Sequence, residues 1–248
     1  MTTIFTLEMR KSSQDKGLIF WTFILPIVFT VLFIAIFTGT VDEQMKEEMI
    51  TSIVPGYTVM FVFFIIISMG TSFLQDRDNG WIARLTSTPL SPMQYLLGKW
   101  LPFSIIVLIQ IIVLQTFGKV VYTIPIEQPV FLLLLAIALT LCTTAIGLAI
   151  AVIIRTNNMG IAITQIIALV GALIGGLWIP YELLPDFLQK IGAFTPQYWA
   201  HDGFMQAMAG TLTIQGLLKS TGVLLGYSAC SLLIAYLAYP RFLQRAKH

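Results

Sequence analysis

Long uncharged stretches recur along the chain and are separated by shorter polar connections. Each stretch has no Lys, Arg, Asp or Glu and is about 20 residues long, the length that an α-helix needs to cross a bilayer core. A membrane β-barrel would instead show short segments of alternating polarity. The pattern therefore predicts an all-α integral membrane protein with six transmembrane helices. The stretches are residues 18–38, 53–74, 100–118, 130–154, 159–179 and 221–239.

Composition narrows the class further. Of the 248 residues, 57% are hydrophobic and only 10% are charged, whereas a soluble domain carries about 25% charged residues. So few charges cannot cover a soluble fold, and a net charge of +2 offers no basic surface to nucleic acid. Residues 1–248 are therefore expected to form a single membrane domain. Cys142 and Cys230 lie inside apolar runs, so neither a disulfide nor a metal site is expected.

Basic residues concentrate on one side of the predicted membrane. With the N-terminus placed inside, ten Lys and Arg residues fall in the inner segments and four fall outside. Cytoplasmic segments carry such an excess of Lys and Arg. Both termini are therefore predicted to be cytoplasmic. The inner segments are residues 1–17, 75–99, 155–158 and 240–248.

Residues 1–17 are predicted to form a helix that lies at the inner membrane interface, with its apolar side towards lipid and its basic side towards water. The alternative interpretation is a frayed, charged tail. The apolar residues are Ile4, Phe5, Leu7 and Met9, and the basic ones are Arg10, Lys11 and Lys16.

The inner connection 75–99 has the pattern of a short helix between two turns. Asn79-Gly80 is a turn dipeptide, and Trp81, Arg84 and Leu85 follow at helical spacing. Ser91-Pro92 then predicts the start of the next helix, with Ser91 as the capping residue. The segment is interpreted either as a docking element for a partner or as a solvated loop.

The outer segment 180–215 is too long for a turn and too interrupted by proline to span. Asp186 is predicted to cap one short helix, and a second short helix is predicted from Gln197. Both are half apolar, which is typical of an extracellular lid or of a re-entrant pair buried against protein or a water-filled cavity.

The fifth span carries a small residue at every fourth position, which lets another helix approach closely. This partner could belong to the same chain or to a second copy. The stripe consists of Gly160, Thr164, Ala168, Ala172 and Gly176.

The predicted spans hold no Asp, Glu, Lys, Arg or His, the residues on which a proton-coupled cycle inside the membrane relies. Gln110, Gln115 and Gln165 are their strongest polar groups, and they suit hydrogen bonds between helices or contacts along a substrate path. No HExxH, GxSxG or Walker A motif is present. His201-Asp202 at the outer boundary is the one pair that an enzyme acting on lipids could use.

Several motifs resemble those of the ABC-2 type permeases, the membrane subunits of bacterial ABC exporters. The inner connection matches the family pattern in order and spacing, although Trp81 and Ala83 replace a threonine and an acid. The matching motifs are Leu25-Pro26, Asp76-Arg77-Asp78-x-Gly80, Arg84-Leu85-x-x-Thr88-Pro89, Gly176-x-x-Ile179-Pro180, Leu184-Pro185 and Thr195-Pro196-x-Tyr198.

This resemblance implies a six-helix permease that pairs with a second copy or a paralogue in the bacterial cell membrane. It implies two separate ATPase subunits that bind ATP and Mg, and an amphipathic or lipid-like substrate that is exported. The small stripe of the fifth span is then assigned to the dimer interface, and the three glutamines to the substrate path. The residues assigned to ATPase docking are Asp76, Arg77, Asp78, Gly80, Arg84, Leu85, Thr88 and Pro89.

Two other functions remain open at this point. The chain could be an importer or channel-like pore that works without nucleotide, or a lipid-modifying membrane enzyme that uses His201 and Asp202.

Overall fold

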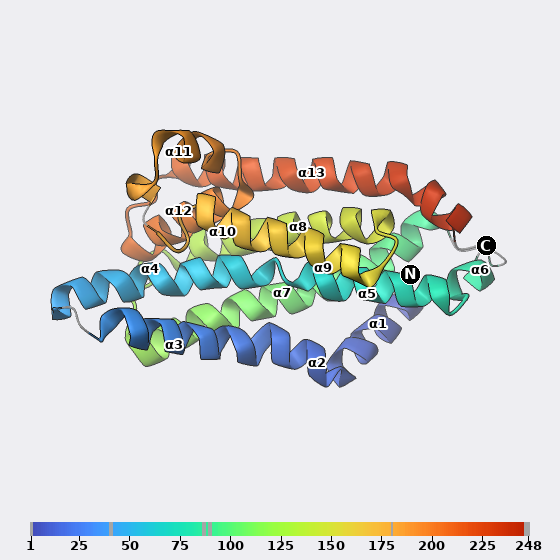
Figure 1. Cartoon of the computed structure of the whole chain (residues 1–248), viewed down its shortest axis with the longest axis horizontal. Coiled ribbons are helices and arrows are strands. Elements are labelled where there is room, and N and C mark those ends of the chain that lie inside the picture. Colours follow the sequence, from blue (N-terminus) through green and yellow to red (C-terminus); the bar gives the residue numbers. More distant parts are fainter. Residues whose placement is uncertain (1, 40–41, 86–87, 89–90, 180, 246–248) are drawn as a thin grey trace.

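The computed structural model describes residues 2–39, 42–85, 88, 91–179 and 181–245. Every regular element in these residues is helical, and the long helices run side by side along the longest axis of the molecule (Figure 1). The elements up to the middle of the chain are α1 (Thr2–Gln14), α2 (Lys16–Ile19), η1 (Phe20–Ile24), α3 (Leu25–Thr38), α4 (Glu43–Val62), α5 (Ile65–Asp78), α6 (Trp81–Leu85) and α7 (Pro92–Tyr122). The later elements are α8 (Pro129–Ile153), α9 (Asn157–Gln165), η2 (Ile166–Val170), α10 (Gly171–Ile174), η3 (Tyr181–Leu183), α11 (Asp186–Gly192), α12 (Pro196–Ala209) and α13 (Ile214–Arg245).

Six helical stretches of the described residues are long and apolar enough to cross a membrane, which confirms the all-α class and the number of spans. Most of them extend beyond the uncharged stretches, because helical hydrogen bonding continues into the polar residues at each end. The stretches are Lys16–Thr38, Met49–Asp78, Met93–Tyr122, Pro129–Ile153, Asn157–Ile174 and Ile214–Gln244.

Helix α8 forms the centre of the bundle. It packs against α5, α7, α12 and α13, and Leu135, Leu139, Cys142 and Ala145 on it are fully enclosed. The first, fifth and sixth spans lie at the periphery and expose most of their side chains. An apolar side chain that faces outward is expected where lipid or another membrane subunit covers the helix.

The start of α7 confirms the signal at Ser91-Pro92. The Ser91 hydroxyl accepts from the Gln94 amide, the Gln94 side chain accepts from the Ser91 amide, and Pro92 occupies the first turn. This reciprocal capping satisfies two amide groups that a helix start otherwise leaves without partners.

The fifth span ends earlier than residue 179. Gly176 adopts a φ of 78°, a left-handed conformation that glycine reaches without steric cost. The Leu177 amide then bonds back to the Ala172 carbonyl, which closes α10 and turns the chain towards the outer segment.

The outer segment contains the two short helices expected from the sequence, but the first of them is not capped as predicted. Asp186 is the first residue of α11, Pro185 holds the capping position, and no side chain caps the helix. The prediction that Asp186 caps this helix was therefore wrong, because Asp186 lies inside the first turn. Thr195 caps α12 through its hydroxyl, and α12 packs against α4, α8 and α13.

The Tyr181 hydroxyl holds this outer segment together by donating to the Gln189 carbonyl. Burial raises the pKa of this phenol above its ordinary value, so the hydroxyl keeps the proton that it donates.

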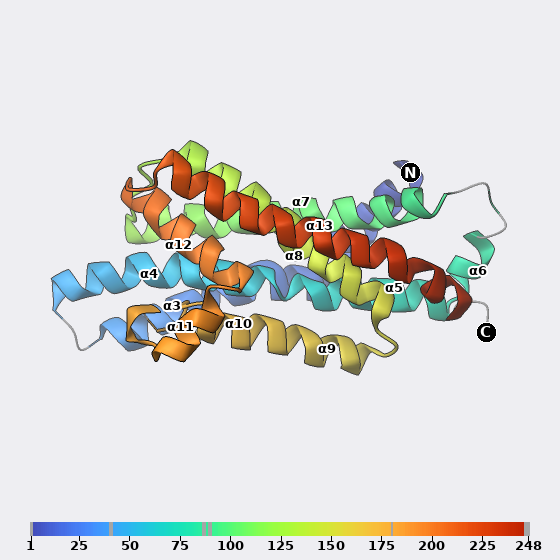
Figure 2. The same ribbon diagram turned by 90° about the horizontal axis from the view of Figure 1, so that it is seen from above.

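Helix α1, helix α6 and the last turns of α13 lie at the same end of the bundle (Figures 1 and 2). Asp15 separates α1 from the first span, because its extended backbone breaks the helix and its carboxylate accepts from the Leu18 amide at 3.0 Å. The buried face of α1 is polar and consists of Glu8 and Ser12. This face packs against α7, so α1 is tied to the bundle by polar contacts as well as by its apolar residues.

Candidate functional site

The second span leads directly into the exposed helix α6. Helix α5 ends at Asp78, Asn79 and Gly80 form the turn, and Gly80 adopts a φ of 69°. Ile82 is buried and holds α6 on the bundle, whereas the side chains of Trp81 and Arg84 are exposed. Helix α6 therefore presents an aromatic and a basic side chain at the tip of the molecule.

The residues predicted to dock an ATPase form two groups: those at the surface or in the turn, and those that point into the bundle. Asp78, Arg84 and Thr88 are exposed, while Arg77 folds onto the chain, pairing with Asp78 at 2.8 Å and donating to the Arg155 carbonyl at 3.1 Å. Gly80 lies in the turn, Leu85 is the last residue of α6, and Pro89 lies outside the described residues. Arg77 thus links this segment to the connection between α8 and α9.

Asp76 belongs to the second group, because its side chain points into the bundle. One carboxylate oxygen lies 2.7 Å from Lys99 Nζ and also accepts from the Tyr95 hydroxyl at 3.1 Å. The other oxygen lies 3.6 Å from Lys11 Nζ. The side chain of Asp76 is 10% exposed, so it contributes charge from within the bundle and no surface for docking.

Lys99 is the centre of this buried network. Its side chain is 0% exposed and its Nζ lies 3.3 Å from Glu8 Oε2, 3.2 Å from the Ser72 carbonyl and 5.2 Å from the centre of the Phe73 ring. With Asp76, these groups give all three ammonium protons a partner. The Ser72 hydroxyl donates to the second oxygen of Glu8. Carboxylates from α1 and α5 therefore meet on one ammonium group of α7.

The sequence pattern places Lys99 among the positive charges of the inner connection, whereas it lies inside α7. The signal available was its setting: a single lysine, seven positions after the helix start at Pro92, between apolar residues. Glu8 and Ser12 are spaced four residues apart and therefore share a face of α1. Their spacing identifies a polar face of α1 but does not indicate which helix that face contacts.

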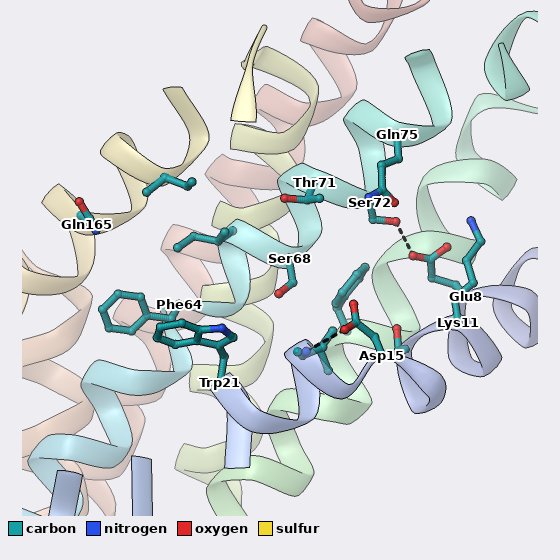
Figure 3. Close-up of a pocket in the computed structure, with 16 residues that line it drawn as sticks. Glu8, Lys11, Asp15, Trp21, Phe64, Ser68, Thr71, Ser72, Gln75 and Gln165 are labelled. Carbon is teal, nitrogen blue, oxygen red and sulfur yellow. Dashed lines mark hydrogen bonds between the residues drawn. The ribbon is translucent and has the colours of Figure 1, made fainter. Parts of the chain in front are cut away.

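A cavity of about 530 Å³ lies beside this network, between the first, second and fifth spans, with Phe103 of the third span also in its lining (Figure 3). One end is polar, and the other end is lined by apolar and aromatic side chains. The polar lining is Glu8, Lys11, Ser12, Asp15, Ser68, Thr71, Ser72 and Gln75, with Gln165 beyond them near Phe64. The apolar lining includes Leu18, Trp21, Phe64, Ile67, Phe103 and Ile161.

Helix α5 supplies one wall of the cavity from a single face. Ser68, Thr71 and Gln75 follow each other at three- and four-residue steps, which brings them to the same side of α5. The row of Ser, Thr and Gln along an otherwise apolar span was the sequence signal for this wall, and it was missed.

Each of the three spans departs from α-helical geometry at, or next to, a residue that lines the cavity. The first has the π-helical turn η1, which contains Trp21, and the fifth has η2, which follows Gln165. The second is interrupted at Phe63 and Phe64, whose amides bond three residues back instead of four. Such π-helical turns occur frequently at functional sites.

The structure does not bring the three predicted glutamines together. Gln165 lines the cavity from α9, whereas Gln110 and Gln115 are buried on α7. Within the described residues, the Gln110 Nε2 and both polar side-chain atoms of Gln115 have no hydrogen-bond partner. Of the three, Gln165 lies where a substrate in the cavity could touch it.

The small stripe of the fifth span faces the interior of the same chain. Thr164, Ala168 and Ala172 are 0% exposed, and Gly160 and Gly176 are buried. The span packs against α4, α5 and α12, and Gln197 of α12 lies so close to Gly171 that an added Cβ would be 2.3 Å from its Nε2. The assignment of these five residues to a dimer interface is therefore corrected to packing within the chain, and the opposite face of the span is the exposed one.

His201 and Asp202 have separate surroundings on α12. His201 is buried, with Nε2 3.4 Å from the Ser52 carbonyl, while both carboxylate oxygens of Asp202 accept from the Gln206 side chain. The two side chains therefore make different contacts, His201 with the α4 backbone and Asp202 with Gln206 of its own helix.

Six helical spans, an amphipathic cavity between three of them and an exposed helix at one end define a multi-pass membrane permease. The sequence pattern described as "ABC-2 family transporter protein" matches residues 42–237, and the chain belongs to this family. It is a protein of the cell membrane, and membership of the family implies an ABC ATPase as its partner.

Two relatives from Bacillus subtilis (strain 168) are similar to the chain. YvfS, described as a transport permease, is 28% identical over 210 residues, which cover 82% of this chain and 83% of YvfS. The linearmycin resistance permease protein LnrN is 27% identical over 174 residues, which cover 70% of this chain and 45% of LnrN.

Proposed function

We propose that the chain is the membrane subunit of an ATP-driven exporter that moves an amphipathic or lipid-like substrate out of the cell. The observation that carries this proposal is the course of α5. It lines the cavity from Ile67 to Gln75 and ends at the turn before α6. A movement of α6 imposed by an ATPase would therefore reach the cavity wall through one continuous helix.

The chemistry of the cavity supports an amphipathic substrate. A polar end and an aromatic end in one cavity suit a molecule that has a headgroup and an apolar body. The relative LnrN is named as a resistance permease, which favours export over import.

The partners follow from the same proposal. Two ATPase subunits would bind ATP and Mg at the end that carries α6, and a second permease copy or a paralogue would complete the complex. The excess of Lys and Arg on this side supports a cytoplasmic location for both termini.

Transport into inverted membrane vesicles tests this function. Vesicles that contain the chain and its ABC ATPase are expected to accumulate a fluorescent amphiphile only when ATP and Mg are supplied outside. Arg84→Glu reverses an exposed charge on α6 and is expected to reduce ATP-dependent accumulation at least tenfold. Lys190→Glu makes the same change on α11, at the other end of the molecule, and serves as the matched control.

Three outcomes count against the proposal. Equal accumulation without ATP would indicate a nucleotide-independent pore, and ATP-driven efflux from the vesicles would indicate an importer. Equal loss in Arg84→Glu and Lys190→Glu would remove α6 as the docking element.

A further inference from the structure

The polar end of the cavity has more negative than positive groups. Glu8, Asp15 and the adjoining Asp76 supply three carboxylates, while Lys11 and Lys99 supply two ammonium groups. Lys99 is fully enclosed and pairs with Glu8 and Asp76. Lys11 pairs with Asp76 at 3.6 Å. Both cations therefore already have partners.

Asp15 is the carboxylate in excess. Among the described residues it forms no ion pair, and its only hydrogen bond is the one from the Leu18 amide to Oδ1. Its side chain is exposed to the cavity, and Figure 3 shows it in the lining between Trp21 and Glu8. One carboxylate oxygen is thus available to a ligand without disturbing the cap of α2.

Aromatic rings continue the lining from this carboxylate. Trp21 belongs to η1 and Phe64 lies at the break in the second span, and both line the same cavity. The face of an aromatic ring attracts a cation, and the rings also give an apolar chain a surface on which to pack. A carboxylate beside aromatic rings is a combination that recognises alkylammonium groups.

We propose that this cavity selects amphiphiles with a cationic headgroup over neutral or anionic ones with the same apolar chain. The inference rests on the proposed function, since it names the substrate class of the same cavity. The ammonium group of the ligand pairs with Asp15, and its apolar chain lies along Trp21 and Phe64. An anionic headgroup would meet Asp15 and Glu8, while Lys99 is fully enclosed and Lys11, 49% exposed, already faces Asp76 at 3.6 Å.

Binding to the full-length chain in nanodiscs tests the proposal. Three fluorescent probes would share one alkyl chain and carry a trimethylammonium, a hydroxyl or a sulfonate headgroup, with empty nanodiscs as background. The cationic probe is expected to bind about fivefold more tightly than the neutral one, as for one partly exposed charge pair. The anionic probe is expected to bind most weakly.

Variants of Asp15 separate charge from helix capping. Asp15→Asn keeps an oxygen for the Leu18 amide but removes the charge, and it is expected to abolish the preference for the cationic probe. Asp15→Glu keeps the charge and is expected to retain the preference. Asp186→Asn makes the same neutralisation on α11, away from the cavity, and is expected to leave all three affinities unchanged.

The outcomes distinguish this inference from the proposed function. Equal affinity for the three probes, or a preference that survives Asp15→Asn, overturns the charge selection and leaves the cavity as a binding site. Phe64→Ala is expected to weaken all three probes. If no probe binds, or if Phe64→Ala changes nothing, the cavity is not the substrate site and this inference fails, whereas the export function itself fails only in the ATP-dependent accumulation assay.

Discussion

The ammonium group of Lys99 is stabilised by carboxylates that two other helices supply. Because Glu8 and Asp76 have little contact with water, each depends on the cation for compensation of its charge. A buried ion pair of this kind contributes little net stability compared with an apolar replacement of all its members, but the loss of one member leaves an uncompensated charge. Lys99 therefore fixes the relative positions of α1, α5 and α7.

Substitution of Lys99 should show this dependence. Lys99→Met is expected to lower the free energy of unfolding by about 3–5 kcal/mol, because it leaves Glu8 buried without a cation and Asp76 with only the more distant Lys11. Glu8→Gln should cost less, since Lys99 keeps Asp76 and the amide oxygen can still accept from Ser72. Denaturant unfolding in detergent measures both changes. Lys190→Met on the exposed end of α11 is the control, and a Lys99→Met variant as stable as that control would contradict the expectation.

For single residues, the sequence showed which charged groups are important but not which residues they pair with. The motif around Asp76 was recognised from local spacing, but the same spacing fits an exposed and a buried carboxylate equally well. Whether Asp76 is exposed or buried depends on Glu8 and Lys99. Both are far from Asp76 in the sequence and reach it only through the packing of α1 and α7. A hydropathy pattern contains no information about such pairs.

Among the elements, those fixed by local chemistry were predicted well. The start of α7 follows from Ser91, Pro92 and Gln94, which are neighbours in the chain. The turn at Gly80 and helix α6 follow from local spacing in the same way. The π-helical turn η2 was not predictable, because the Ile167 carbonyl within it accepts a hydrogen bond from Gln197 of a distant helix at 2.9 Å.

The contact between α10 and α11 offers a test at the scale of elements. An added Cβ on Gly192 would lie 2.1 Å from the Ile174 carbonyl oxygen, a backbone atom that cannot turn aside. Gly192→Ala is therefore expected to force α11 away from α10 and to destabilise the protein by about 1–3 kcal/mol, measured as a lower melting temperature in detergent.

The control for this change is another helical glycine with open space. Around Gly222 on α13 an added Cβ meets no atom within 4 Å, so Gly222→Ala is expected to stabilise the helix by roughly 0.5–1 kcal/mol. Equal effects of the two substitutions, in either direction, would show that the packing of α11 on α10 does not constrain Gly192.

For the whole molecule, the hydropathy pattern predicted six spans but not which of their faces lie inside. Close helix packing in a membrane uses small residues whether the partner is the same chain or another, so the stripe in the fifth span could not identify its partner. The cavity could not be predicted from the sequence either, because it depends on how three spans and α1 are placed relative to one another. What the fold adds is an exposed face on the fifth span: Ile166, for example, is 63% exposed.

Cross-linking tests whether this exposed face meets a second copy of the chain. In a background that lacks Cys142 and Cys230, oxidation is expected to link Ile166→Cys between copies, because this position faces outward from η2. Thr164→Cys lies two residues away but is fully enclosed, so it should stay monomeric. Leu233→Cys on α13 is exposed as well but belongs to another span than Ile166, and it is expected to face lipid and to stay monomeric. If Thr164→Cys cross-links and Ile166→Cys does not, the dimer contact would lie at the small stripe. The enclosed face of the fifth span would then have to be exposed in the complex.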